Sequence, residues 1–381
     1  MYWLSGCLWI SPEEHATRRD FDGDGVPAPT DCNDTNLHIA PGLPEIACNL
    51  TDDDCDPDTA DGPAFSVAVT FPTIQMALDL AAPGAEIGLC AGTYTEALTL
   101  RRDGVTLSGN PDLPSILSTE QREGVASVTV LGADNRLRLL EIRGGTGNDR
   151  DGVRTGGVID ATDAAGDLTL EDVVVHGGTA DVGAGIVAPA LYRLVLTRSV
   201  VRDNVATDLG GGVYAEGGVV LDGAEITANA ASTGGGMWIG GSATVDAVGS
   251  RVVGNGATDG AGLYVAGDVF GLEVRDNDAA DRGGGVLLDQ GDLVDVVCAD
   301  NVADRGGGVA GTGTVTRGTI EANLAGEGGG LWFSDAGTLV GVTVRGNTAT
   351  TGPGGGVYAL GELVVTDDPS SAVSTRIESN T

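Results

Sequence analysis

One phrase recurs through the second half of the chain and constrains its fold more than any other feature. Each copy has an apolar residue, two variable residues and an asparagine, then a short gap, three small residues and an apolar or aromatic pair. In the clearest copy, Val201 to Asn204 is followed by Gly210 to Tyr214. The third glycine falls at positions 212, 236, 262, 285, 308, 330 and 356, so copies are 22 to 26 residues apart. Self-similarity at this period is typical of a solenoid.

Each repeat also supplies short apolar runs, such as Leu194 to Leu196 and Val219 to Leu221. These runs are too short for helices and lie between glycine-rich corners, so they indicate buried parallel strands. Two or three strands per repeat make one coil of a parallel β-helix. We therefore predict an all-β fold, a right-handed parallel β-helix over residues 65–381. About a dozen coils at the usual strand spacing give a rod of roughly 55–60 Å.

The repeated asparagine has a physical reason at a corner of such a coil. Stacked side-chain amides can hydrogen-bond along the rod, and asparagine tolerates left-handed backbone. Before residue 200 the phrase decays, and Gly177 stands where the asparagine is expected. The predicted ladder comprises Asn204, Asn229, Asn255, Asn277, Asn301, Asn323, Asn347 and Asn380.

Aromatic residues follow several glycine triplets in the same register, at Tyr214, Trp238, Tyr264, Trp332 and Tyr358. On the outside of the rod such a stripe would suit stacking on sugars, whereas inside it would be core. The alternation of residues leaves both placements open.

Candidate catalytic residues are adjacent arginine and aspartate residues that recur beside the asparagine or the glycines. A catalytic site is a singular event in a solenoid, so we interpret these recurring residues as solvated turns with weak ion pairs. We predict no catalytic residue, and His176 has no nucleophile nearby in the sequence. The pairs are Arg202/Asp203, Arg275/Asp276, Asp281/Arg282 and Asp304/Arg305.

The charge is strongly acidic, with 55 Asp and Glu against 20 basic residues, a formal net charge of −35. All the basic residues are arginine. A field of this sign repels nucleic acid and anionic membranes, so we expect no nucleic-acid partner. It favours cations, although a generally acidic surface explains it equally well.

Residues 18–62 form an acidic, cysteine-bearing segment with the spacing of a calcium loop. Asp20, Asp22 and Asp24 take loop positions 1, 3 and 5, Gly25 takes position 6 and Asp31 position 12. Alternate carboxylates can converge on one ion while glycine makes the sharp turn. Aspartate at position 12 replaces the usual bidentate glutamate, and no helical pattern flanks the loop. We predict a Ca2+ site here; an acidic linker is the alternative.

Three cysteines of this segment, Cys32, Cys48 and Cys55, indicate a disulfide-bearing extracytoplasmic module. We expect one bridge among them and leave the pairing open. Cys90 and Cys298 lie in apolar runs and are predicted to be buried thiols.

Further acidic clusters follow the calcium loop, and the whole run resembles the MopE-type metal-binding motif of bacterial surface proteins. The resemblance implies metal binding without naming the metal. One extra residue before Cys48 and Pro57 in place of glycine are departures. The matching residues are Asp20 to Gly25, Asp31 to Asp34, Pro41-Gly42, Glu45 to Cys48, Asp52 to Asp56 and Asp61.

A short amphipathic helix is predicted over residues 72–82, with Ile74, Ala77, Leu78 and Ala81 on one face. With the following residues 85–96 and 104–109, it resembles the opening of pectin-lyase-like right-handed β-helix proteins. The helix would cap the first coil. The repeats also resemble those of chlamydial polymorphic outer-membrane proteins, with valine or isoleucine mostly in place of phenylalanine.

The two ends carry separate expectations. Leu4 to Cys7 resembles a bacterial lipobox, in which Cys7 would be lipidated, but only three residues precede it. Either the true start lies upstream, in which case residues 1–17 are a signal remnant and linker, or the match is chance. The last phrase stops after Asn380, so we expect a continuing chain or a partner to cover the final coil.

Two functions follow from these observations. The first is a secreted or cell-surface bacterial β-helix protein with a structural, adhesive or carbohydrate-binding role, attached to a membrane only through Cys7. The second is a β-helix polysaccharide lyase or glycoside hydrolase. A non-repeating cluster of three or more Asp, Glu or Arg residues on one face would favour the second, and the sequence shows none.

Overall fold

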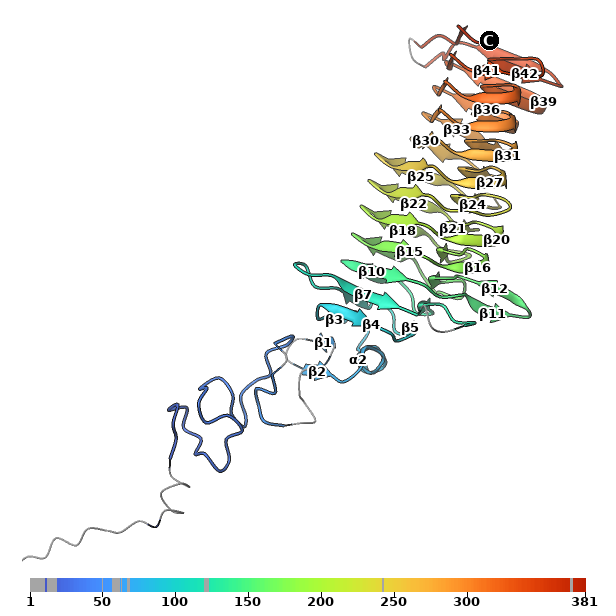
Figure 1. Ribbon diagram of the computed structural model, residues 1–381. Coiled ribbons are helices and arrows are strands. Elements are labelled where there is room, and N and C mark those ends of the chain that lie inside the picture. Colours follow the sequence, from blue (N-terminus) through green and yellow to red (C-terminus); the bar gives the residue numbers. More distant parts are fainter. Residues whose placement is uncertain are drawn as a thin grey trace, which may run out of the picture.

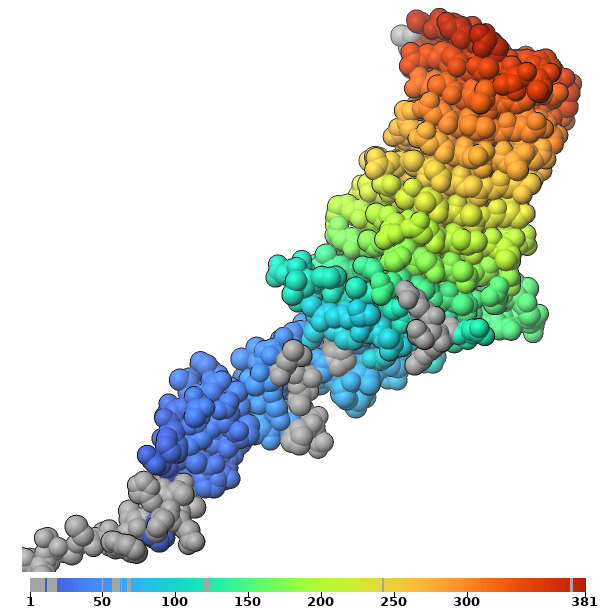
Figure 2. All heavy atoms as spheres, viewed as in Figure 1, coloured from blue at the N-terminus to red at the C-terminus, as the bar shows by residue number. Residues whose placement is uncertain are grey.

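The computed structural model describes residues 11, 19–49, 51–56, 62, 64–66, 69–119, 123–241, 243–370 and 373–381. Its described part is a parallel β-solenoid of about eleven coils, which confirms the predicted fold class. The coils stack along one axis, and the acidic segment lies beyond the first coil (Figure 1). Figure 2 shows the coils following one another along the rod in sequence order.

One face of the rod is a sheet of twelve parallel strands, one from each successive coil. Its inward positions hold apolar side chains such as Ile226, Val252 and Val274, all with no exposed surface. The strands are β4 (Gly92–Tyr94), β7 (Ser115–Ser118), β10 (Leu140–Arg143), β15 (Val174–His176), β19 (Val200–Arg202), β23 (Glu225–Thr227), β26 (Arg251–Val253), β30 (Glu273–Arg275), β34 (Val297–Ala299), β37 (Thr319–Glu321), β40 (Thr343–Arg345) and β44 (Arg376–Glu378).

A 23-stranded sheet covers the rest of the core in two rows of strands. The first row is β5 (Leu98–Leu100), β8 (Val128–Val130), β13 (Ile159–Asp160), β17 (Ile186–Val187), β21 (Val213–Ala215), β24 (Met237–Ile239), β28 (Leu263–Val265), β32 (Val286–Leu288), β36 (Val309–Thr316), β39 (Leu331–Val340) and β42 (Val357–Ala359). The second row is β3 (Glu86–Leu89), β6 (Thr106–Ser108), β9 (Asn135–Arg138), β14 (Leu168–Glu171), β18 (Leu194–Thr197), β22 (Val219–Asp222), β25 (Val245–Val248), β29 (Val269–Phe270), β33 (Asp292–Val294) and β43 (Leu363–Thr366). The long strands β36 and β39 belong to both rows.

Two small sheets form a third side, and an antiparallel pair precedes the rod. The antiparallel pair is β1 (Ala64–Ser66) with β2 (Val69–Phe71). The small sheets are β11 (Asn148–Arg150), β12 (Val153–Thr155), β16 (Thr179–Val182) and β20 (Val205–Leu209), and β27 (Gly256–Asp259), β31 (Asp278–Arg282), β35 (Val302–Arg305), β38 (Leu324–Glu327) and β41 (Thr348–Ala349).

The helix α2 (Ile74–Leu80) packs on the first coil and buries Ile74, Ala77 and Leu78. It is shorter than the predicted range 72–82. Thr73 is the N-cap, so Pro72 precedes the helix, and the backbone leaves the helical region at Ala81. The Glu96 carboxylate also accepts hydrogen bonds from the backbone N–H groups of the first turn, at 3.1 Å each. These contacts satisfy donors that a helix start leaves unpaired.

The left-handed backbone of each coil lies one residue earlier than predicted. The ladder asparagines do not have positive φ; the residue before each one does, for example Asp203 at 55° and Ala322 at 55°. Strand register likewise pairs His176 with Arg202, so Gly178, not Gly177, occupies the asparagine position of its coil. Gly178 donates its N–H to the Asn204 side-chain oxygen at 2.9 Å, and Gly177 takes the left-handed place at 69°. The asparagine repeats because of its amide, and its own backbone is ordinary.

Candidate functional site

The predicted calcium loop brings its carboxylates together. Asp22, Asp24 and Asp31 each place a carboxylate oxygen within 4.8 Å of the others, and Asp20 groups in the same way with Asp22 and Asp34. Asp34 was not among the predicted ligands, although it lies in the acidic stretch Asp31 to Asp34.

The carboxylates of the loop hold the backbone turn, Asp20 with both oxygens and the other three with one oxygen each. Asp20 accepts from the N–H groups of Gly23 and Gly25 at 2.7 and 3.0 Å. Asp22, Asp24 and Asp31 each accept from the N–H two residues further on. Their second oxygens, Oδ2 in all three, are buried without a hydrogen-bond partner. Buried oxygens normally have a partner, so this arrangement fits a bound cation.

Electrostatics in the loop point the same way. Loss of hydration raises the pKa of the Asp22 carboxyl, and repulsion from Asp24, Asp31 and Asp20 raises it further. A divalent cation would reverse both effects, since its charge favours the ionised carboxylates. The all-oxygen set suits Ca2+ or another hard cation. The residues present therefore fit the predicted ion.

A second acidic cluster comprises Glu45, Asp52 and Asp54. One oxygen of Glu45 accepts from the N–H groups of Asp53 and Asp54, at 2.8 and 3.0 Å. Glu45 Oε2 and Asp52 Oδ1 are buried without a hydrogen-bond partner. Burial raises the pKa of the Glu45 carboxyl, and the charges of Asp54 and Asp53 add to the effect.

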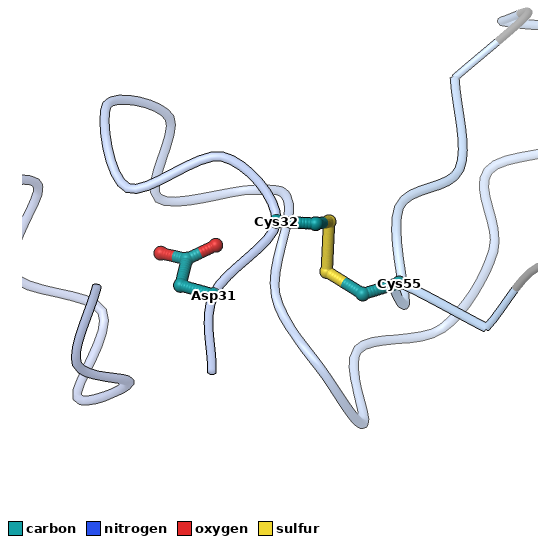
Figure 3. Close-up of side chains that lie close together, drawn as sticks. All are labelled: Asp31, Cys32 and Cys55. Atoms are coloured by element: carbon teal, nitrogen blue, oxygen red, sulfur yellow. A yellow bond between two sulfur atoms is a disulfide. The ribbon is translucent and has the colours of Figure 1, made fainter. Parts of the chain in front are cut away.

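Two disulfides involve the acidic segment, one within it and one that joins it to the rod. Cys32 is bonded to Cys55, beside Asp31 of the calcium loop (Figure 3), and Cys48 is bonded to Cys90. The prediction of a thiol at Cys90 is therefore wrong. Cys90 follows β3, so this bridge ties the acidic segment to the first coil of the rod, a pairing over 42 residues that local spacing does not reveal. Cys7 lies outside the described residues.

Cys298 is a buried free thiol in the core of β34. Complete burial raises its pKa to about 12. The thiolate is the reactive form of cysteine, so this residue is a packing group and not a nucleophile.

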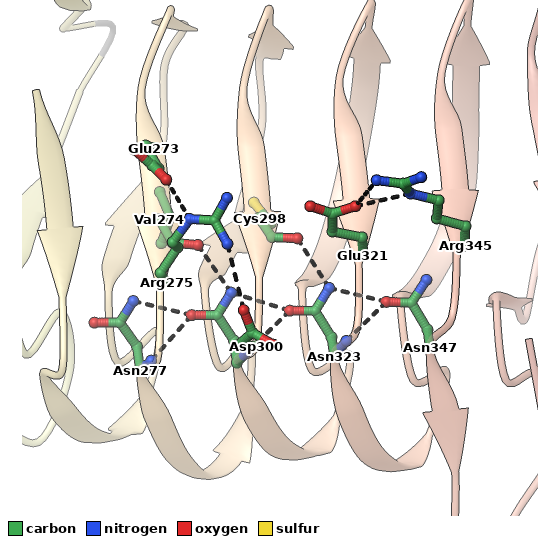
Figure 4. A network of polar contacts seen from close by, with 11 residues as sticks. Glu273, Val274, Arg275, Asn277, Cys298, Asp300, Glu321, Asn323, Arg345 and Asn347 are labelled. Carbon is green, nitrogen blue, oxygen red and sulfur yellow. Dashed lines mark hydrogen bonds and ion pairs between the residues drawn. The ribbon is translucent and has the colours of Figure 1, made fainter. Parts of the chain in front are cut away.

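The asparagine ladder is continuous from Asn204 to Asn380. The side-chain oxygen of Asn301 accepts from both the backbone N–H and the side-chain Nδ2 of Asn277, each at 3.0 Å. Its own Nδ2 donates to Asn323 Oδ1 and to the Val274 carbonyl, each at 3.0 Å. Figure 4 shows this pattern passing from coil to coil. The amides from Asn204 to Asn347 are buried and hydrogen-bonded, which makes the ladder a structural element.

The third glycine of each phrase is explained by the same ladder. A Cβ placed on Gly285 would lie 2.5 Å from the Gly308 carbonyl oxygen and 3.0 Å from Asn301 Nδ2. Any side chain there would push two coils apart. The glycine and the asparagine of neighbouring coils are therefore one packing unit.

The recurring arginines pair mostly with acids of a neighbouring coil, and Arg282 also lies 3.7 Å from the adjacent Asp281. Arg282 pairs with Asp259 at 2.9 Å, and Arg305 pairs with Asp281. Arg275 contacts both Glu273 and Asp300 (Figure 4). Arg202, which pairs with Asp203, keeps the adjacent partner. His176 lies 3.1 Å from Glu141 of the preceding coil.

A non-repeating charged cluster that the sequence did not reveal lies around the β11–β12 hairpin. The Asp160 carboxylate has no exposed surface and accepts from Arg150 at 3.2 Å and from the Thr162 hydroxyl at 2.7 Å. Arg150 also pairs with Asp163, and Arg154 pairs with Asp181 at 3.2 Å. All three aspartates are thus engaged by arginine. This is the kind of non-repeating cluster that would favour a lyase or hydrolase. Glycoside hydrolysis, however, uses two carboxyl groups as acid and base or nucleophile, and here the three carboxylates are paired with arginine.

The aromatic stripe lies on the outer face over three coils and sinks into the surface further on. Tyr214, Trp238 and Tyr264 are half-buried and stacked, with ring centroids 4.6 and 5.4 Å apart and planes 6° apart. Trp332 is only 6% exposed and lies under the Arg305 guanidinium.

Comparison of the chain with protein-family models, with curated proteins and with solved structures found no match. The resemblances to MopE-type, pectin-lyase-like and polymorphic outer-membrane proteins therefore stay predictions. Within the described ranges, no helix has the length and apolar character needed to cross a membrane.

Proposed function

We propose that this protein is a secreted or cell-surface bacterial rod with a structural, adhesive or carbohydrate-binding role and a calcium-stabilised N-terminal module. Calcium binding by the module is supported by three buried carboxylate oxygens without a hydrogen-bond partner, on Asp22, Asp24 and Asp31. The ladder supports the structural role, because every side-chain amide from Asn204 to Asn347 hydrogen-bonds to the next coil.

The two disulfides support the location. Disulfides persist in oxidising compartments and are rare in reducing ones. Small segments that cannot build a hydrophobic core are the usual place for them, and residues 19–56 are such a segment. An extracellular setting also supplies calcium at concentrations suited to weak oxygen-ligand sites.

Calcium titration of the full chain tests the proposal. We expect saturable binding by calorimetry, and a thermal transition of the module that rises when Ca2+ replaces chelator. At a calcium concentration of 100 times Kd the gain is about 2.7 kcal/mol. The variant Asp24→Asn should weaken binding at least tenfold, since it removes one ligand charge.

The matched control is Asp222→Asn, which removes one exposed carboxylate from the rod. It makes the same change in net charge away from the loop. Equal affinity of wild type and Asp24→Asn, or equal loss in both variants, would rule out the loop as the calcium site.

A further inference from the structure

One row of outward side chains runs along the first strand row of the large sheet, at one position per coil. We name it the Tyr214 row. Large side chains at some coils and small ones at others make its height uneven. In register, it comprises Thr129, Asp160, Val187, Tyr214, Trp238, Tyr264, Leu287, Ala310, Trp332 and Tyr358.

The step from Tyr214 down to Val187 opens a recess on the outer face. Its volume is about 240 Å³. Val187 and Ala188, 3% and 2% exposed, form its apolar floor. Tyr214, Glu216, Thr155 and Thr162 also line it. The recess therefore combines an apolar floor, one aromatic wall and hydroxyl groups at the rim, which is the usual make-up of a small-molecule site.

The stacking geometry decides which aromatic surface is free. One face of the Tyr214 ring is covered by Trp238, at 4.6 Å and nearly parallel. The opposite face is directed to the preceding coil, where register places Val187. A valine covers less of a ring face than an aromatic side chain does, and both Tyr214 and Val187 line the recess. Trp238, the inner ring of the stack, is covered on both faces.

Polar groups hold the ring and set the charge of the recess. The Tyr214 hydroxyl donates to Glu216 at 2.7 Å, and burial together with this carboxylate raises the pKa of the phenol. The phenol stays protonated at neutral pH and the ring is held at one angle. Thr162 is anchored from below by the buried Asp160, which accepts from its hydroxyl. The non-repeating cluster thus supports this wall of the recess.

We infer that the recess binds one unit of a neutral carbohydrate, with the C–H face of the sugar ring against Tyr214. An aromatic wall beside hydroxyl-bearing side chains matches the two surfaces of a pyranose, one apolar and one polar. Glu216 and the net charge of −35 disfavour acidic sugars. This inference rests on the carbohydrate-binding part of the proposed function and is independent of the calcium loop.

Calorimetry and saturation-transfer NMR on the full chain provide the test. The probes are glucose, galactose, mannose and N-acetylglucosamine, the disaccharides cellobiose, maltose and N,N-diacetylchitobiose, and galacturonate as the acidic comparison. We expect saturable binding of at least one neutral sugar below about 50 mM, and weaker binding of galacturonate. Tyr214→Ala should weaken the binding at least about tenfold.

Two further variants keep the test decisive if Tyr214→Ala folds poorly. Val187→Phe fills the recess, and neighbouring coils already carry an aromatic side chain at this register beside an equivalent left-handed glycine. We expect it to fold normally, with an unchanged or higher melting temperature, and to abolish sugar binding. Tyr264→Ala removes the ring at the other end of the stack, and we expect no loss of affinity.

Three results with the neutral sugars would overturn the inference. They are no saturable binding by any neutral sugar, unchanged binding in Val187→Phe, and loss of binding in Tyr264→Ala but not in Tyr214→Ala. Tighter binding of galacturonate than of the neutral sugars would also contradict it. Calcium binding measured on the same samples separates the outcomes, since it reports on the module whether or not the recess binds sugar.

Discussion

The rod and the acidic module are stabilised by opposite kinds of interaction. In the rod, valine, leucine and isoleucine fill a continuous core, and buried amides join each coil to the next. Among the described residues of 19–56, the buried hydrophobic side chains are only Ile39 and Ala40. This segment is held by backbone turns on its own carboxylates and by two cross-links. A chain that lacks a core can still be ordered, provided that covalent bonds or ions replace it.

The two regions should respond differently to local damage. A solenoid gains stability from each coil and each interface between coils, so damage at one coil spreads only to its neighbours. A cross-linked module depends on a few interactions, and loss of any one affects all of it. Substitutions in the two regions should therefore differ in size and in the transition that they move.

The largest effect is expected at the centre of the ladder, in Asn301→Ala. The change removes four side-chain hydrogen bonds and leaves the buried backbone N–H of Asn277 without its acceptor. Each unsatisfied buried group costs about 1–3 kcal/mol, so we expect a loss of about 3–5 kcal/mol in the free energy of unfolding. Urea denaturation followed by circular dichroism measures it.

The neighbouring variant Val302→Ala is the control, because Val302 is 39% exposed and lies outside the ladder. It should cost less than about 1 kcal/mol. Equal effects of the two variants would show that strand packing, and not the ladder, joins the coils.

The second prediction concerns the bridge within the module, removed in the double variant Cys32→Ser with Cys55→Ser. The bond spans 23 residues, and loop-closure entropy of that order is about 3 kcal/mol. We expect the module to become sensitive to limited proteolysis and to lose calcium affinity, while the transition of the rod stays unchanged. A shift in the rod transition would mean that the two regions unfold as one unit, contrary to the contrast drawn above.

The same contrast explains what sequence alone could predict. The repeat is local and periodic, so fold class, strand positions and the identity of the ladder residues follow from spacing. The sequence pattern places the left-handed residue one position late, because the asparagine and the residue before it recur together. Cys48–Cys90 joins distant segments and has no periodic signal. The recess at Tyr214 likewise depends on Val187, 27 positions earlier, which becomes its neighbour only through register.

The third prediction concerns Asp181, which lies in a coil that has no ladder asparagine and which pairs with Arg154. Hydrogen bonds from the Arg154 backbone and side chain, and from the Thr207 hydroxyl, lower the pKa of Asp181 to about 2. Its stabilising effect is therefore present above the ordinary pKa near 3.8 and is lost as the pH falls through about 2. Asp181→Asn should lose about 1–2 kcal/mol at neutral pH.

The stability of wild type and Asp181→Asn should differ at neutral pH but not in acid. Below about pH 2 wild type and Asp181→Asn should have the same stability, because the wild-type carboxyl is then protonated. Urea denaturation at neutral and acidic pH measures both. A difference that persists in acid would assign the loss to packing instead of charge.

The smallest effect is expected from the exposed ion pairs between coils, represented by Arg345→Ala. Arg345 pairs with Glu321, and its side chain is 58% exposed. Surface pairs of this kind contribute about 0–1 kcal/mol and are screened by salt. We expect a loss of less than about 0.5 kcal/mol that disappears in high salt. Asp24→Asn, which also removes one charge, should instead change the module strongly through calcium. If Arg345→Ala proves as damaging as Asn301→Ala, the outer charges join the coils as much as the buried amides do.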